Sequence, residues 1–187
     1  MLYAKDIATD WVKVGTMLSV THWLGGGSIL SKSWQKMSLY TLLGFTAYHV
    51  TTRGLLTPQG LSGKTKAVAD DVIKMGTMLV VSRLLSGGSL ADQNWIRSTI
   101  AILIGFVVYN ILTVNYIKGK EVSHHPKLRD TVDDWAKFGT MLLVSRLISC
   151  ESVLDSKWII SSLNTLIGFS TYDIVTSHVV DAVFDEY

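Results

Sequence analysis

The sequence contains few of the residues that would cross-link, interrupt or charge a chain. Its single cysteine, Cys150, excludes an internal disulfide and a cysteine-based zinc site. Both of its prolines, Pro58 and Pro126, lie in polar stretches, so the apolar segments can form uninterrupted helices. Charged residues make up 17% of the chain, below the roughly 25% of a soluble domain. Together with a mean hydropathy of +0.33, this composition favours a membrane protein.

Two further classes of protein lack support in the charge pattern. The net charge is +2 and no block of Lys or Arg occurs, so the chain has no electrostatic footprint for nucleic acid. Residues 1–6 lack the basic and apolar regions of a signal peptide. We therefore expect internal segments to insert the chain into a lipid bilayer.

A threefold internal repeat is the most informative feature that is present. Asp-x-x-Lys-x-Gly-Thr-Met-Leu occurs three times, and each copy is followed by a polar turn, a Trp and then Gly-Phe-x-x-Tyr. The first motif lies at 10–18, 71–79 and 134–142, and the second at 44–48, 105–109 and 168–172. Repetition of this kind indicates one supersecondary unit used three times.

Each unit is predicted to be a helical hairpin. An Asp at the start of each first motif is an N-cap type, and the Lys three residues later could pair with it on the helix surface (Asp10, Asp71 and Asp134). Glycines then end the first helix, except that Ser149-Cys150-Glu151 stands in the third turn, which should differ in detail. Three further N-cap residues begin the second helix (Ser31, Asp92 and Asp155).

The constant residues of each unit fall on one helix face. In the second helix they recur with spacings of four and three, as a heptad-like seam does, and a glycine beside the seam would let a neighbouring backbone approach closely. We predict that these faces pack hairpin against hairpin. The seam residues are Met17, Trp34, Phe45 and Tyr48, then Met78, Trp95, Phe106 and Tyr109, and finally Met141, Trp158, Phe169 and Tyr172.

The predicted fold is all-α: a membrane bundle of three tandem helical hairpins, about six helices, arranged as parallel repeats about a pseudo-three-fold axis. We expect one domain over 1–187. The repeat units cover 8–56, 69–117 and 132–180, and the polar linkers cover 57–68 and 118–131. Because each unit has two helices, all three units insert with the same orientation. A small excess of Lys and Arg in the linkers favours cytosolic termini.

Membrane crossing is best supported for residues 98–117, which carry no charge over about 20 residues. Residues 37–52 and 159–175 are weaker candidates. The first helices are doubtful, because about 14 helical residues between Asp71 and Ser86 reach only about 21 Å. A soluble or peripheral helical bundle stays open as the alternative.

Candidate chemistry is sparse. We predict no catalytic, cofactor-binding or metal-ligating residues, and we interpret the polar residues after each Tyr as membrane-interface residues (His49, Asn110 and Asp173). Arg83 and Arg146, which correspond to His22, could form a basic ring that attracts anions, but we favour the interpretation that their guanidinium groups reach the membrane surface. The repeated Trp and Tyr fit packing and interfacial anchoring.

The segments 76–90 and 42–49 resemble small multi-span membrane proteins of large icosahedral double-stranded DNA viruses. The resemblance covers the repeat cores. It implies a virion inner-membrane protein that lies beneath the capsid and contacts minor capsid proteins. Our first hypothesis is therefore a non-enzymatic integral membrane protein with a structural or assembly role, whose partners are the bilayer and other structural proteins. A homo-oligomer stays open as well. The alternatives are a small transporter or channel with a pore on the repeat axis, and a soluble helical adaptor.

Overall fold

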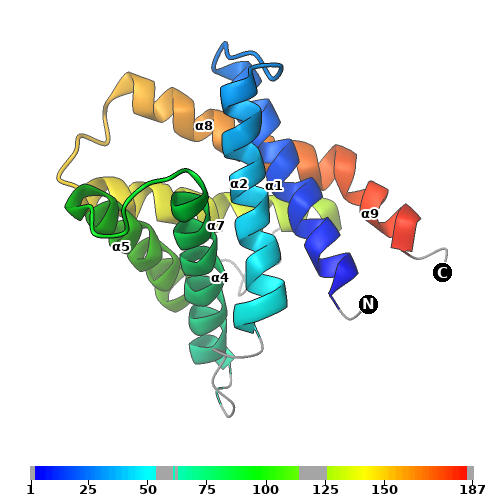
Figure 1. Ribbon diagram of the computed structural model, residues 1–187, viewed down its shortest axis with the longest axis horizontal. Coiled ribbons are helices and arrows are strands. Elements are labelled where there is room, and N and C mark those ends of the chain that lie inside the picture. The colour runs from blue at the N-terminus through cyan, green and yellow to red at the C-terminus, as the bar shows by residue number, and fades with distance from the viewer. Residues whose placement is uncertain (1–2, 54–60, 62, 114–125, 185–187) are drawn as a thin grey trace.

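The computed structural model describes residues 3–53, 61, 63–113 and 126–184, and within these ranges the chain is helical and contains no strand (Figure 1). The prediction of an all-α fold is thus confirmed for the described residues. The first hairpin consists of α1 (Ala4–Leu24) and α2 (Lys32–Ala47), the second of α4 (Gly63–Leu85) and α5 (Gln93–Val108), and the third of α7 (Pro126–Ile148) and α8 (Ser156–Thr171).

Each second helix continues into a π-helical turn at the same place in the repeat. These turns are η1 (Tyr48–Thr52), η2 (Tyr109–Thr113) and η3 (Tyr172–Thr176), and η3 leads into α9 (Ser177–Phe184). Each π turn begins at the Tyr of Gly-Phe-x-x-Tyr. Since π turns are rare and occur often at functional sites, their threefold recurrence directs attention to these positions.

The first helices begin earlier than the sequence predicted. α1, α4 and α7 start six to eight residues before Asp10, Asp71 and Asp134, so these aspartates lie inside helices and the N-cap interpretation was wrong. The helices have 21, 23 and 23 residues instead of about 14. Residues 63–68 and 126–131, predicted as linker, are helical, while linker residues 57–60, 62 and 118–125 lie outside the described residues.

The three hairpin turns are built alike. Gly26 (φ +80°) and Gly87 (φ +77°) adopt left-handed backbone angles, and Cys150 does the same at φ +55° although it is not glycine. The turn hydrogen bonds also match, because the backbone N–H of Gly88 donates to Arg83 O and that of Glu151 to Arg146 O. The expectation of a different third turn was therefore wrong.

The second helices begin at the predicted N-caps, Ser31, Asp92 and Asp155. The Asp92 carboxylate accepts hydrogen bonds from the backbone N–H groups of Asn94 and Trp95, and the Asp155 carboxylate from that of Trp158. The cap hydrogen bonds from Trp95 and Asn94, with the nearby Arg83, lower the pKa of Asp92 below 3.8. The starts of α5 and α8 are thus encoded locally, whereas the side chain of Ser31 makes no cap hydrogen bond at the start of α2.

The six long helices form a closed ring. Within each hairpin the two helices are neighbours, and between hairpins α2 packs on α4, α5 on α7, and α8 on α1. Figure 1 shows α2 beside α4, and α9 near the beginning of α1. The contacts between hairpins are more extensive than those within them. The third hairpin therefore closes back on the first, so the ring depends on residues about 150 positions apart.

A repeated glycine–methionine contact joins the hairpins. A Cβ placed on Gly44 would lie 2.7 Å from the carbonyl oxygen of Met78, and one on Gly105 would lie 2.7 Å from the Cα of Met141. Gly168 meets Met17 in the same way, at 2.8 Å from its carbonyl oxygen. The predicted close approach beside the seam is confirmed, and it joins the two constant motifs across hairpins. Only glycine leaves room for this backbone contact.

Many large apolar side chains are exposed. Ile100 is 50% exposed and Ile160 is 58% exposed, and large apolar side chains are exposed along the outward faces of all three hairpins. By length and composition, one helix of the described part could cross a bilayer, Gln93–Leu112, with mean hydropathy 1.7 and 28% of its apolar window buried. It overlaps the predicted span 98–117. The weaker predicted spans at 37–52 and 159–175 do not reach the same apolarity and length within the described residues.

Candidate functional site

Three ion pairs link the first helices of the hairpins in a cycle. Lys74 Nζ lies 2.7 Å from Asp10 Oδ1, Lys137 Nζ lies 2.6 Å from Asp71 Oδ1, and Lys13 Nζ lies 2.5 Å from Asp134 Oδ2. We name these six residues the ion-pair ring. From the sequence, each Asp could pair with the Lys three residues later on its own helix. The structure corrects this, because each Lys instead reaches the Asp of the preceding hairpin, and the first Lys reaches the third.

Each lysine of the ion-pair ring also lies over the aromatic rings of the seam. Lys74 Nζ is 5.5 Å from the centroid of the Phe45 ring and 5.8 Å from that of Tyr48. Equivalent contacts join Lys137 to Phe106 and Tyr109, and Lys13 to Phe169 and Tyr172. The carboxylate and the aromatic faces together stabilise a cation that is only about a quarter exposed.

The seam aromatics are thereby placed in the interior. Phe106 is fully buried, and Phe45, Phe169 and the three tyrosines are each at most 8% exposed. Met78 is buried, whereas Met17 and Met141 are partly buried in the glycine contacts described above. Each seam Trp is half-buried and stacks at its own hairpin turn, on His22 for Trp34, Arg83 for Trp95 and Arg146 for Trp158.

We predicted that the polar residue after each seam Tyr lies at a membrane interface, and this prediction was wrong because all three residues are buried. His49 is 5% exposed, Asn110 5% and Asp173 4%. His49 Nε2 lies 2.7 Å from Asp10 Oδ2, and Asn110 Nδ2 donates to Asp71 Oδ2 at 2.7 Å. The π turn brings each of these side chains into the ion-pair ring. The residue type differs between the three units, so it did not indicate a shared buried site. The signal that was available is that all three residues are polar and occupy the same position of the repeat.

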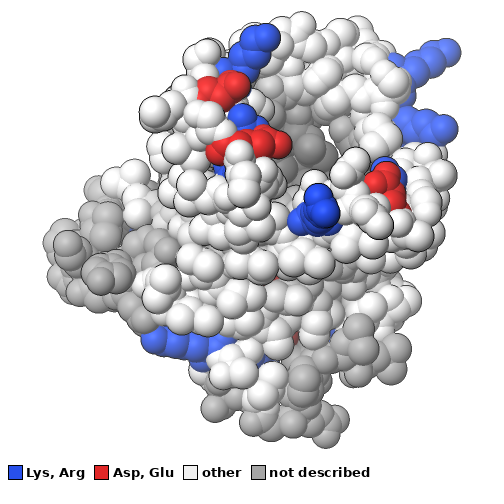
Figure 2. Space-filling model, turned by 90° about the vertical axis from the view of Figure 1, so that its left-hand side faces the viewer, with Lys and Arg blue, Asp and Glu red and all other residues white. Residues whose placement is uncertain are grey.

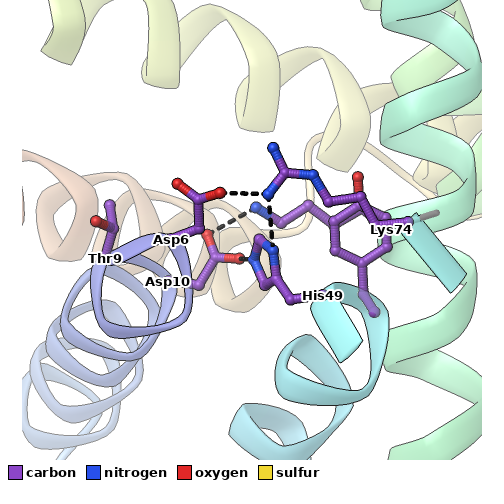
Figure 3. Close-up of a pocket in the computed structure, with 7 residues that line it drawn as sticks. Asp6, Thr9, Asp10, His49 and Lys74 are labelled. Atoms are coloured by element: carbon purple, nitrogen blue, oxygen red, sulfur yellow. Dashed lines mark hydrogen bonds and ion pairs between the residues drawn. The ribbon is translucent and has the colours of Figure 1, made fainter. Parts of the chain in front are cut away.

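The first unit has a complete set of partners around its Asp, in a cavity of about 270 Å³ (Figure 3). Asp10 accepts from Lys74 on one oxygen and meets His49 on the other. Since a carboxylate only accepts, His49 Nε2 carries the hydrogen, which leaves Nδ1 to accept from Arg53 at 3.3 Å. Arg53 also forms an ion pair with Asp6. Every charge in this cavity is therefore matched.

The third unit has a different set of side chains around its Asp, Asp134. Asp173 takes the place of His49, and an ionised carboxylate cannot donate to Asp134. Among the described residues, Asp173 Oδ2 is buried without a hydrogen-bond partner. A cavity of about 370 Å³ opens here, and Lys13, Asp130, Tyr172, Asp173 and Ser177 are among the residues that line it. Among the described residues, the two buried side-chain oxygens without a hydrogen-bond partner are both in this unit, Asp173 Oδ2 and Asp134 Oδ2, and of the two only Asp134 Oδ2 has an ion-pair contact, with Lys13 Nζ at 2.5 Å.

Arg83 and Arg146, the predicted anion or interface pair, are both engaged within their own turns. Arg83 donates to Ser89 O and forms an ion pair with Asp92, and Arg146 donates to Ser152 O and pairs with Glu151. His22 Nε2 approaches Ser28 O in the same manner. Figure 2 looks onto the face that carries the last two hairpin turns and shows a hollow with charged side chains of both signs around it. These positions brace the turns.

Within the described residues, no group of three or more His, Cys, Asp and Glu could hold a metal ion. The site can hold charges at fixed positions inside an apolar shell. No protein-family model matches the chain, and no match was found among curated proteins or solved structures.

Proposed function

We propose that the chain is a non-enzymatic integral membrane protein with a structural role. The observation that supports this best is the distribution of polarity in the described residues. Charged and amide side chains such as Asp10, Asp173 and Asn110 are buried, while Ile100, Ile160 and other large apolar residues face outward. On a soluble monomer, large exposed apolar patches are rare and mark interaction sites, membranes among them. In a bilayer, by contrast, ionisable residues face the bundle interior and pair with one another.

The lengths of the helices suit a bilayer. α5 with η2 has 21 residues, which is about 31 Å at 1.5 Å per residue, close to the thickness of the hydrocarbon core. α4 and α7 have 23 residues each, so these first helices are also long enough to cross the hydrocarbon core. We therefore propose three hairpins that insert in parallel about a pseudo-three-fold axis, with the linkers and both termini on one side.

The ion-pair ring favours a scaffold over a transporter. Each of its lysines is bound to a carboxylate and covered by two aromatic rings, and Arg83 and Arg146 are bound within their turns. Groups that must take up and release a solute would need weaker, exchangeable partners. The viral inner-membrane setting, with the capsid as partner, rests on the sequence resemblance, and we propose it as the place where such a scaffold would act.

The native cysteine allows a direct test of membrane crossing. Cys150 is exposed in the turn between α7 and α8. In sealed proteoliposomes we expect a membrane-impermeant maleimide to label Cys150 from the side opposite to an epitope tag at the N-terminus. The Cys150→Ser variant is the labelling control. Labelling from the same side as the tag, or extraction of the protein by alkaline carbonate, would refute the spanning hairpins.

The transporter hypothesis has its own test. The same liposomes are loaded with a chloride-sensitive dye, and flux is compared between the wild type and the double variant Arg83→Ala, Arg146→Ala. A scaffold gives no flux above empty liposomes with either protein. Flux that the double variant abolishes would replace the structural role by an anion pathway.

A further inference from the structure

Two cavities of the structure occupy equivalent positions in the first and third units. Residues of the third unit are offset by 124 from those of the first, so Asp130 corresponds to Asp6, Asp173 to His49 and Ser177 to Arg53. Lys13 has the same relation to Asp134 as Lys74 has to Asp10. The first cavity thus serves as an internal reference for the third.

In the first cavity a guanidinium group supplies the balancing charge. Arg53 pairs with Asp6 and donates to His49 Nδ1, and Figure 3 shows these contacts beside Asp10 and Lys74. The Arg53 side chain is provided by the chain itself, at the first residue after η1. The cavity that remains measures about 270 Å³.

In the third cavity a short side chain, Ser177, takes the position of Arg53, and the lining carries more negative charge. Ser177 has neither the aliphatic stem nor the guanidinium group of Arg53, and the cavity is larger, about 370 Å³. Relative to the first unit, the exchange of Arg53 for Ser177 removes a positive charge and that of His49 for Asp173 adds a carboxylate. Lys13 is the one cation among the described lining residues, and it is already bound to Asp134.

A buried carboxylate in the wall of the third cavity supports a ligand. Asp173 is 96% buried, lines the cavity, and has an Oδ2 atom without a hydrogen-bond partner among the described residues. Burying an acceptor of this kind without a donor is costly. The ring of Tyr172 lines the same cavity, and Lys13 Nζ lies 5.4 Å from its centroid, so cations already favour this wall.

We infer that the third cavity binds a guanidinium group carried by another molecule, between Asp130 and Asp173, in the place that Arg53 fills in the first unit. The planar fork of a guanidinium matches two carboxylates better than an ammonium does. The hydroxyl group of Ser177 can accept a further N–H. This site is independent of the structural role in the membrane, and either proposal can fail without the other.

Calorimetric titration of methylguanidinium into the full chain in detergent at pH 7.5 tests the site. We expect saturable binding at one site, tighter than that of methylammonium, and no binding of the uncharged methylurea. Asp173→Asn places in the third unit the residue that the second unit uses at Asn110, so this variant is expected to fold. It should bind methylguanidinium at least 10-fold more weakly.

A second variant tests the occupant directly. Ser177→Arg places in the third unit the residue found at Arg53, and its guanidinium should fill the cavity, raise the melting temperature and abolish binding of methylguanidinium. Asp92→Asn, which lies in a hairpin turn, removes a carboxylate far from the cavity and should leave binding unchanged. Absence of saturable binding by the wild type, or equal binding by the wild type, Asp173→Asn and Ser177→Arg, would overturn the inference.

Discussion

Replacing Gly105 by Ala should destabilise the closed ring of six helices, whereas the same replacement at Gly76 should stabilise it. Both glycines lie inside long helices, where Ala is favoured over Gly by about 1 kcal/mol. A Cβ on Gly76 would meet nothing within 4 Å. A Cβ on Gly105 would lie 2.7 Å from Met141 Cα and 2.9 Å from Met141 O, both backbone atoms that cannot rotate away. The pair of variants therefore isolates the cost of the hairpin contact.

The magnitude follows from the distances. Ordinary van der Waals contact begins at 3.4 Å, so α5 and α7 must separate by about 0.7 Å at Gly105. Overpacking of this kind costs roughly 1–3 kcal/mol, and the backbone contact places it in the upper half of that range. After the helix propensity of about 1 kcal/mol is subtracted, Gly105→Ala should lose about 1–2 kcal/mol. Gly76→Ala should gain about 1 kcal/mol.

Thermal or denaturant unfolding of the purified protein in detergent, followed by circular dichroism, measures both variants under identical conditions. Gly44→Ala and Gly168→Ala should behave like Gly105→Ala, because a Cβ there would lie 2.7 Å from the backbone of Met78 and 2.8 Å from that of Met17. If Gly105→Ala is as stable as Gly76→Ala, the two helices do not approach as closely as the structure places them, and the packing argument fails.

Three further outcomes can be measured with the same unfolding assay. Lys74→Met should lower the free energy of unfolding by about 1–3 kcal/mol, which is less than for a fully buried ion pair because the Lys74 side chain is 28% exposed. As a control, Lys32→Met at an exposed position should change it by under about 0.5 kcal/mol. Equal effects of the two variants would argue against the ion-pair ring. Cys150→Gly should gain about 0.5–1 kcal/mol by relieving a left-handed residue, and a loss would mean that the thiol contributes to the turn. Folding lowers the pKa of Asp92, so its ionised cap stabilises the folded state above pH 3.8, and this stabilisation is lost as the pH falls below that value. Acidification should therefore destabilise the wild type more than Asp92→Asn. Parallel curves of stability against pH for the two proteins would contradict the cap.

Local patterns determined the helical elements. The seam spacing, the N-caps at Asp92 and Asp155 and the apolar run of α5 are set by residues within a few turns of one another, and each could be predicted because local backbone preferences act at that range. The sequence did not predict that α1, α4 and α7 begin before their Asp residues. An Asp inside a helix cannot be told from an N-cap Asp in the sequence unless the groups that it binds are known.

What the sequence by itself determined is the unit: three copies of one hairpin, with glycine placed for a close contact and with no visible catalytic pattern. Only the tertiary structure decided which hairpin each face meets, since ring closure brings Lys13 to Asp134, 121 positions away in the chain. It also decided that His49, Asn110 and Asp173 are buried and that His49 and Asn110 bind carboxylates of the ion-pair ring. Burial and charge pairing between distant segments depend on how the helices pack in three dimensions, and no short-range pattern in the chain carries that information.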